Sequence, residues 1–354
     1  MATHLTLAAE PRYFRGASIQ SRLLGFSLRH TVRPVLGLWA RLPFDLFPPN
    51  VVDHIARLLP VHEGTMWRTV DLETCKAEWL QAKGVADIHA STDSSANQGA
   101  ILYFHGGAFL TCGLNTHRRL VSRISYASKQ PVLNVGYRQM PYEPITESVA
   151  DGVDGFRWLL DQGYRPENIT IAGDSAGGYL AFSVARAVMD KGWGRPAGVV
   201  AISPLLDFDP TGKLNHRNAN RCQTFPVNAV ARLSEVSLRM DTTRGIAGTR
   251  LCPVDMPLAD MPPALIHIGS REVLMADAEL MANRLVSAGV PCELQVWDRQ
   301  VHVFHAAAAW IPEARVAIEE IGTFVRGLAH QEAIATIPVA AVRSVRRTKT
   351  AAQL

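Results

Sequence analysis

The sequence lacks the features that mark secreted, disulfide-linked and membrane-spanning proteins. Its five cysteines are scattered and form no Cys-x-x-Cys pair and no Cys/His ligand pattern. This absence argues against a disulfide framework and a structural zinc site, and it favours a reducing compartment. No run of about 18 uninterrupted apolar residues occurs, and the N-terminus has no basic stretch followed by an apolar one. We therefore expect no transmembrane helix, no secretory signal and a cytoplasmic location.

Charge of either sign is also sparse, and the formal net charge is only +4. Residues 1–60 hold seven arginines and three acidic residues, and residues 331–354 hold four basic residues and one acidic residue. Basic ends around a mildly acidic middle section do not suggest a nucleic-acid-binding protein. Solvated ends explain the pattern, and association of the N-terminal section with an anionic membrane is the alternative.

What the chain does contain is a regular alternation of short apolar runs and amphipathic segments, without internal repeats. Runs rich in Val, Ile and Leu suit strands buried on both faces of a parallel sheet. The alternation predicts an α/β fold with a mostly parallel central sheet and helices on both faces. The expected strands are 100–104, 131–137, 169–173, 198–203, 263–269 and 292–297, and the expected helices are 117–129, 147–162, 177–190 and 277–288.

Two segments interrupt this pattern. Residues 17–58 mix Arg with Leu, Phe and Trp at rough helical spacing, and prolines divide them into short helices. They are interpreted as a lid over an active site or, alternatively, as an interfacial membrane anchor through residues 17–47. Residues 205–262 contain one helix-like segment, 226–240, and are interpreted as a second lid. The predicted division is an N-terminal helical cap 1–60, a first core part 61–204, an inserted cap 205–260, a second core part 261–330 and a mobile basic tail 331–354.

The segment Gly173-Asp174-Ser175-Ala176-Gly177 connects an expected strand to an expected helix. This is the G-x-S-x-G nucleophile elbow in its strand–turn–helix setting. Bulky residues two positions before or after the serine would collide with the strand and the helix. We predict that Ser175 is a nucleophile at a helix N-terminus, where the dipole favours negative charge. A helix-capping serine is the alternative for the motif in isolation.

Upstream, an expected strand leads into His105-Gly106-Gly107. Glycines at such a turn let main-chain N–H groups face a carbonyl oxygen without obstruction by side chains. The predicted oxyanion donors are the N–H groups of Gly106, Gly107 and Ala176. His105 is expected to support the loop through hydrogen bonds rather than to act as a base. Taken alone, this segment could be an ordinary turn.

The nucleophile elbow implies the chain order serine, acid, histidine. Glu272 follows the expected strand 263–269 and is the preferred acid, with Asp277 as the alternative because it suits a helix cap. His302 follows the last expected strand and is the preferred base, with His305 three residues later as the alternative. Glu272 would orient His302, which would take the proton from the serine hydroxyl.

These motifs resemble the hormone-sensitive-lipase-like family of bacterial carboxylesterases and lipases, over roughly residues 70–328. The resemblance implies an α/β-hydrolase fold, a helical cap over the pocket and hydrolysis of short- to medium-chain carboxylic esters. Two departures concern the site: Ala108 replaces the usual fourth residue of His-Gly-Gly-Gly, and Glu272 replaces an aspartate. The resemblance rests on HGGAF at 105–109, GDSAGG at 173–178, Tyr137-Arg138 with Pro141, Met261-Pro262-Pro263, and His302-Val-Phe in place of His-Gly-Phe.

The predicted function is a serine carboxylesterase that acts on uncharged small-molecule esters through an acyl-enzyme, with no metal, organic cofactor or nucleic acid. One alternative is an interfacial lipase that acts on longer acyl esters and docks through residues 17–47. Another is a non-catalytic small-molecule binder on the same fold. Amide cleavage and acyl transfer use the same residues and stay open, as does the oligomeric state, a homodimer included.

Overall fold

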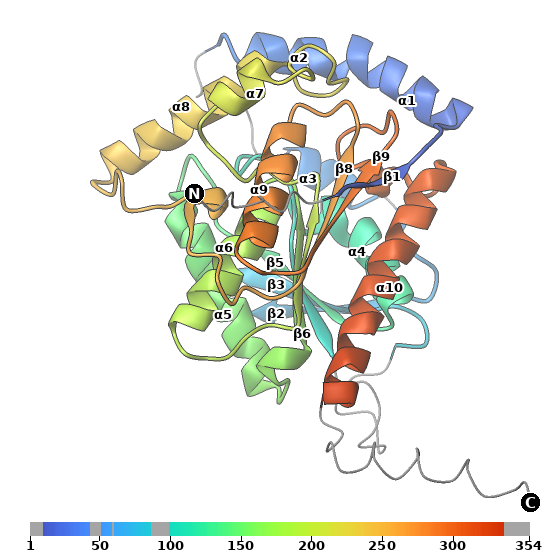
Figure 1. Ribbon diagram of the computed structural model, residues 1–354, viewed down its shortest axis with the longest axis vertical. Coiled ribbons are helices and arrows are strands. Elements are labelled where there is room, and N and C mark those ends of the chain that lie inside the picture. The colour runs from blue at the N-terminus through green and yellow to red at the C-terminus, as the bar shows by residue number, and fades with distance from the viewer. Residues whose placement is uncertain (1–9, 43–50, 59, 86–98, 336–354) are drawn as a thin grey trace, which may run out of the picture.

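The computed structural model describes residues 10–42, 51–58, 60–85 and 99–335. In this part of the chain, nine strands form one sheet at the centre of the molecule (Figure 1). The strands are β1 (Arg12–Phe14), β2 (Met66–Asp71), β3 (Lys76–Gln81), β4 (Ala100–Phe104), β5 (Val132–Gly136), β6 (Ile169–Asp174), β7 (Gly198–Ile202), β8 (Ala264–Gly269) and β9 (Cys292–Trp297).

The strand order is β1-β9-β8-β7-β6-β4-β5-β3-β2, and all pairings from β1 to β5 are parallel. The strands β3 and β2 are antiparallel and close the other edge. The mostly parallel sheet and the α/β-hydrolase fold are confirmed. The six expected strands appear as β4 to β9, with ends that differ from the expected ones by one residue at most.

The three strands at the edges were not predicted from the sequence. The strand β1 has only three residues, too few for a periodic signal, and it is held by its neighbours. The ring of Phe14 stacks on Trp297 at 3.8 Å, and Arg12 pairs with Glu293 and Glu320. The hairpin of β2 and β3 carries charged residues and exposes most of β2. Edge strands of this kind lack the apolar alternation that identifies a strand from sequence.

Five long helices flank the sheet. They are α4 (Leu114–Ser128), α5 (Ile145–Asp161), α6 (Ala176–Asp190), α9 (Met275–Ser287) and α10 (Pro312–Ala335). Figure 1 shows α5, α6 and α9 on one face and α4 with α10 on the other. Four of them were predicted, but α10 was not. The helix α10 ends at Ala335, inside the expected mobile tail 331–354, so the mobility of that tail stays a prediction. The rest of the tail lies outside the described residues.

Four helices lie across the carboxyl end of the sheet (Figure 1), and we call them the roof. They are α1 (Ile19–His30), α2 (Val32–Trp39), α7 (Thr211–Asn215) and α8 (Val227–Thr243). The roof joins segments far apart in the sequence, since the Asn228 amide donates to the Gly37 carbonyl at 3.4 Å. The shorter helices elsewhere are α3 (Val51–Ala56), η2 (Pro166–Asn168), η3 (Pro253–Asp255) and η4 (Phe304–Ala307).

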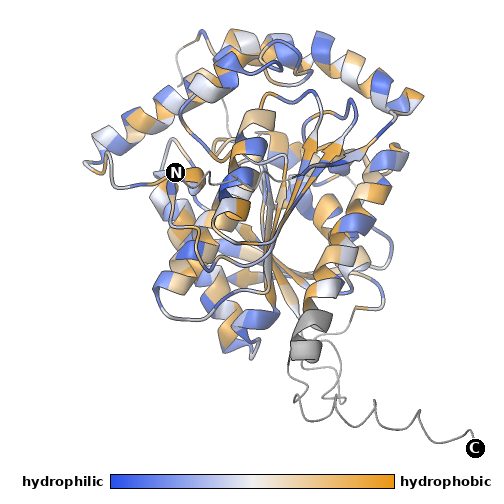
Figure 2. Ribbon diagram, viewed as in Figure 1, coloured by the Kyte–Doolittle hydropathy of each residue, from blue (hydrophilic) through white to orange (hydrophobic). Residues whose placement is uncertain are grey.

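Burial of apolar side chains on both faces of the sheet holds the layers together. Figure 2 shows the hydrophobic strands between helices that are hydrophobic on one side only. Phe104 and Phe156 are fully buried in the cluster beneath α5 and α6, and Tyr103 and Ile124 in the cluster beneath α4 and α10. A fully buried side chain of this size contributes roughly 1.5–3 kcal/mol. The two clusters fix the sheet, and the sheet in turn fixes the loops at its carboxyl end.

A buried ion pair ties the inserted segment to the core. The Lys213 ammonium in α7 donates to Asp277 Oδ1 at 2.7 Å, and neither side chain is more than 3% exposed. The second oxygen of Asp277 accepts the N–H groups of Leu206 (2.9 Å) and Asp207 (3.1 Å). Burial raises the pKa of Asp277, and Lys213 opposes that shift. Each buried charge depends on the other, because an unpaired charge in this position is strongly unfavourable.

We expect Lys213→Met to lower the free energy of unfolding by about 3–5 kcal/mol, because it leaves Asp277 without its partner. Urea denaturation measures the change. The double variant Lys213→Met with Asp277→Asn should recover part of the loss, since the amide oxygen can still accept the N–H groups of residues 206 and 207. A loss below about 1 kcal/mol in the single variant would show that the pair does not hold the segment.

Candidate active site

Ser175 occupies the sharp turn between β6 and α6. Its backbone has φ 53° and ψ −115°, a conformation that non-glycine residues rarely adopt. The Ser175 N–H donates to the Ile202 carbonyl at 2.8 Å, and its own carbonyl accepts the N–H groups of Gly178 and Leu205, both at 3.0 Å. Such strain persists where surrounding contacts enforce it, and it is common at functional sites.

The two glycines of the motif are required by the close approach of three backbone segments. A Cβ atom at Gly173 would overlap the carbonyl of Gly177, and a Cβ atom at Gly177 would overlap the carbonyl of Phe104 at the end of β4. These overlaps are with backbone atoms, which cannot move aside without opening the sheet. The serine is thereby held at the first turn of α6, where the helix dipole is positive.

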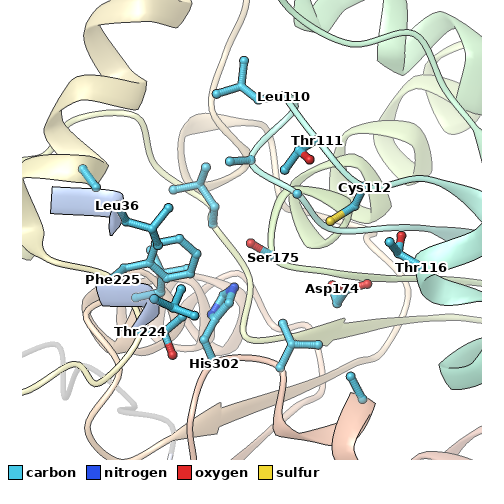
Figure 3. Close-up of a pocket in the computed structure, with 18 of the residues that line it drawn as sticks. Leu36, Leu110, Thr111, Cys112, Thr116, Asp174, Ser175, Thr224, Phe225 and His302 are labelled. Carbon is cyan, nitrogen blue, oxygen red and sulfur yellow. The ribbon is translucent and has the colours of Figure 1, made fainter. Parts of the chain in front are cut away.

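His302 and Glu272 form a hydrogen-bonded pair beside this serine. His302 Nδ1 lies 2.7 Å from Glu272 Oε2. The other oxygen of Glu272 accepts from the Ser203 hydroxyl at 2.8 Å and from the Gly269 N–H at 2.7 Å. Figure 3 shows the His302 ring and the Ser175 hydroxyl facing the same pocket. The structure therefore brings together the three residues that the sequence selected as nucleophile, base and acid.

Phe225 fixes the orientation of the imidazole from the roof side. Its ring meets His302 edge to face, with 4.8 Å between centroids and 87° between planes. This contact limits rotation of His302, while Glu272 holds its Nδ1 side. Phe225 could not be predicted from the sequence, because it lies in the inserted segment, far along the chain from His302.

Neither alternative acid nor alternative base reaches the pocket. Asp277 is committed to Lys213 in the core. His305 is fully buried, with its Nε2 3.0 Å from His267 Nδ1. Burial lowers the pKa of His267 to about 3 and that of His305 well below its usual value, so both rings are neutral. They form a structural pair beneath the site.

The predicted oxyanion loop needs one correction. The Gly106 N–H donates to Asp174 Oδ1 at 3.1 Å, so it is occupied and does not face the pocket. Gly107 and Ala108 do line the pocket, and their N–H groups have no acceptor within the described part of the chain. The available donors are therefore those of Gly107 and Ala108, together with Ala176 at the start of α6. The Asp174 carboxylate that competes for the Gly106 N–H could not be predicted from the sequence.

Asp174 supports the loop from behind. Its carboxylate also accepts from the Tyr103 hydroxyl at 2.7 Å and lies 3.2 Å from His117 Nε2. Burial alone would raise the pKa of Asp174, but His117 and Tyr103 lower it below its usual value. Burial would lower the pKa of His117, but Asp174 raises it. Each group of this buried pair therefore favours the charged form of the other, and the pair could not be predicted from the sequence. Its only signal was an acidic residue inside the nucleophile motif.

His105 has the contacts of a structural residue. It is fully buried, and its Nδ1 lies 2.7 Å from the Gly106 carbonyl. Its ring stacks on Tyr137 at 4.3 Å, and the Tyr137 hydroxyl donates to the His105 carbonyl at 2.7 Å. Burial lowers the pKa of His105 to about 4, so the ring is neutral near pH 7. These contacts fit the predicted support of the loop.

The pocket has a volume of about 480 Å³ and mostly apolar walls. The oxyanion loop contributes Leu110, Thr111 and Cys112, as expected from the sequence. Figure 3 shows Leu36 and Phe225 on the side of His302, across from this loop. The roof therefore forms one wall of the pocket. Its lining residues on α2 and α8 are Val32, Leu36, Trp39, Ala229, Val230 and Leu233.

One group of side chains has the spacing of metal ligands. Asp207, Cys252 and Asp255 place one ligand atom each within 4.8 Å of one another. However, Asp255 pairs with Arg284, and burial raises the pKa of the Cys252 thiol. A protonated thiol is a poor metal ligand. All five cysteines of the chain are free.

Comparison with known proteins identifies the family. The profile described as the alpha/beta hydrolase fold matches residues 101–306. The chain belongs to the α/β-hydrolase family. It is 40% identical to the esterase LipU of Mycobacterium tuberculosis, over 83% of this chain and 98% of that protein. It is 36% identical to the carboxylesterase/phospholipase LipF of the same organism, over 88% of this chain and 82% of that protein.

Solved structures place this α/β-hydrolase among the esterases. EstE5 superposes with a TM-score of 0.74 at 31% identity, covering 89% of this chain and 100% of that one. An esterase from the bacterial hormone-sensitive lipase family gives a TM-score of 0.74 at 27% identity, with the same coverage. The resemblance seen in the motifs is confirmed, and the protein is a carboxylic ester hydrolase.

The buried pair of His267 and His305 predicts that the esterase loses stability in acid. The unfolded imidazoles take up protons as the pH falls through about 6.5, whereas folded His267 stays neutral until about pH 3. The contribution of the pair is complete above pH 6.5 and decreases as the pH falls below it. Between pH 6.5 and 4, the free energy of unfolding should therefore change less steeply with pH in His267→Gln than in the wild type. Removing this one titrating group lowers the slope by up to about 1.4 kcal/mol per pH unit. Urea denaturation across this range measures the slope, and an unchanged slope would contradict the assignment.

Proposed function

We propose that this esterase hydrolyses uncharged, short- to medium-chain carboxylic esters with Ser175 as nucleophile, His302 as base and Glu272 as acid. The observation that carries the proposal is the 2.7 Å contact between Glu272 and His302, in a pocket that both His302 and Ser175 line. The strained backbone of Ser175 adds support, since such strain is common at functional sites.

The proposed reaction follows from these positions. Because His302 Nδ1–H donates to Glu272, its Nε2 carries the lone pair and accepts the proton of the serine hydroxyl during attack on the ester carbonyl. The negative carbonyl oxygen is stabilised by the N–H groups of Gly107, Ala108 and Ala176. The protonated His302 then gives its proton to the leaving alcohol, and an acyl-enzyme remains. Water attacks the acyl group by the same steps and releases the acid.

Glutamate in place of the usual aspartate is accommodated by its anchors. The Ser203 hydroxyl and the Gly269 N–H hold one oxygen of Glu272, and the other is left for His302. Because both of its oxygens are held by hydrogen bonds, the Glu272 side chain is fixed despite the extra methylene that distinguishes it from aspartate. This supports a working triad with glutamate in this chain.

The pocket favours a modest, uncharged acyl group. Its apolar roof suits a hydrocarbon chain, and its volume of about 480 Å³ is in the range of pockets that hold small molecules. Relatives bear names that agree with this size, among them an acetyl-hydrolase of Streptomyces hygroscopicus. The EstE5 crystal was soaked with p-nitrophenyl butyrate. We place the acyl chain beneath α2 and α8.

Interfacial action on longer esters is the second candidate, and one observation favours it. The outer side of α1 and α2 exposes Leu23, Phe26, Val35 and Leu38, among arginines. Such helices can lie in a membrane surface. No described helix is both long and apolar enough to cross a bilayer. A rate that rises when anionic vesicles carry the ester would favour this candidate over the soluble esterase.

The proposed triad predicts which variants lose activity on p-nitrophenyl esters from acetyl to palmitoyl. Ser175→Ala should lower kcat by at least about 10⁴-fold, and Glu272→Gln should lower it by on the order of 10⁴-fold because His302 loses its orienting partner. The surface variant Glu167→Gln serves as the control and should retain wild-type rates. Ser175→Ala with wild-type activity would refute the assignment.

The proposed acyl site predicts a shift in chain-length preference. Leu36→Trp fills the pocket beneath α2, so kcat/KM for the longest good substrate should fall roughly tenfold while the acetyl ester changes little. The matched control is Leu38→Trp on the same helix, where the side chain is 56% exposed. Equal chain-length profiles for the two variants would place the acyl group elsewhere.

A further inference from the structure

Three arginines on two neighbouring helices lie near one another, and one of them lines the pocket. Arg119 of α4 lines the pocket and lies over the ring of Trp310, 5.1 Å from its centre. Trp310 also lines the pocket and is 66% exposed, so this wall faces solvent. Arg123 follows one turn later on α4, and Arg315 lies in the first turn of α10, which packs against α4 (Figure 1).

This cluster has no acidic partner within the part of the chain that the structure describes. None of the three guanidinium groups forms an ion pair or a side-chain hydrogen bond there, and the Nε of Arg123 is buried without an acceptor. Glu313, close in sequence to Arg315, is committed to Ser18 and Ser21. Burial lowers the pKa of Arg123, and the charges of Arg119 and Arg315 lower it further.

The neighbouring arginine shows the usual arrangement. Arg118, adjacent to Arg119 on α4, binds both carboxylate oxygens of Glu78. Arg138 is likewise paired with Asp151. The three clustered guanidinium groups have no such carboxylate. They repel one another, and one buried donor has no acceptor, so the arrangement is unfavourable unless a bound ligand supplies the acceptor. Guanidinium groups bind phosphate and carboxylate oxygens with matched geometry.

We propose that Arg119, Arg123 and Arg315 bind an anionic group, a phosphate or a carboxylate, on the alcohol part of the ester substrate. This rests on the proposed function, in which the acyl chain lies beneath α2 and α8. The leaving alcohol then faces the wall of Arg119 and Trp310. These substrates go beyond the uncharged esters of the proposed function: the apolar pocket takes an uncharged acyl chain, while the alcohol part carries its anion outside that pocket, at its mouth.

The test uses pairs of esters that share a butyryl group and differ in the charge of the alcohol. The phosphate pair is 1-butyrylglycerol 3-phosphate and neutral 1-butyrylglycerol. The carboxylate pair is 3-(butyryloxy)propanoate and its neutral amide. Release of butyrate gives kcat/KM for each, and the anionic-to-neutral ratio is the measured quantity. We expect the wild-type ratio to be well above one for at least one pair. In Arg119→Gln and in Arg123→Gln this ratio should be roughly tenfold lower.

Two further variants keep the test decisive. Arg315→Gln changes an exposed residue and should also lower the ratio, so it replaces Arg123→Gln if that variant does not fold. Arg157→Gln, on α5 at the opposite face of the sheet, removes the same charge and should leave the ratio unchanged. The pair with the larger ratio identifies the anion as phosphate or carboxylate.

The outcomes separate this proposal from the proposed function. If the neutral esters are hydrolysed but the ratio stays near one in wild type and variants, the anion site is wrong and the esterase proposal stands. If the ratio falls equally in Arg157→Gln, the effect is one of overall charge and the site is also wrong. If neither neutral nor anionic esters are hydrolysed, the proposed function fails, and the anion site with it.

Discussion

The strained turn at Ser175 is the constraint on which the rest of the site depends. Its positive φ is held by hydrogen bonds to Ile202 and Leu205, which belong to the next strand and its loop. The close approach of Gly177 to the end of β4 brings the oxyanion loop beside the serine. One backbone conformation therefore positions the hydroxyl, the first turn of α6 and the loop donors together. A fixed arrangement of this kind stabilises developing charge without reorganisation during the reaction.

A second layer of buried polar groups keeps that arrangement in register. Asp174 joins the turn to the loop through Gly106 and pairs with His117. On the other side of the serine, Glu272 joins the loops after β7 and β8 to His302. Both carboxylates are buried, so their hydrogen bonds are strong and costly to break. The roof adds Phe225 and closes the pocket with an apolar wall.

Much of the fold and of the site could be predicted from the sequence, because their signals are local. The elbow at Ser175 and the positions of Glu272 and His302 after late strands follow from spacing along the chain. Contacts between distant segments could not be predicted. The Gly106 N–H was assigned to the oxyanion hole because its acceptor, Asp174, is 68 residues away. The pairing of α2 with α8 and the three-residue strand β1 likewise depend on neighbours that only folding supplies.

The central proposal is a covalent acyl group on Ser175. Mass spectrometry of the enzyme, stopped with acid during turnover of p-nitrophenyl butyrate, tests it most directly. We predict a butyryl group on the peptide that contains Ser175, and none on that peptide in Ser175→Ala. A butyryl group on another residue but not on Ser175 would contradict the proposal. So would unmodified protein during steady hydrolysis under conditions where added alcohols speed turnover, because deacylation is then rate-limiting and an acyl-enzyme should accumulate.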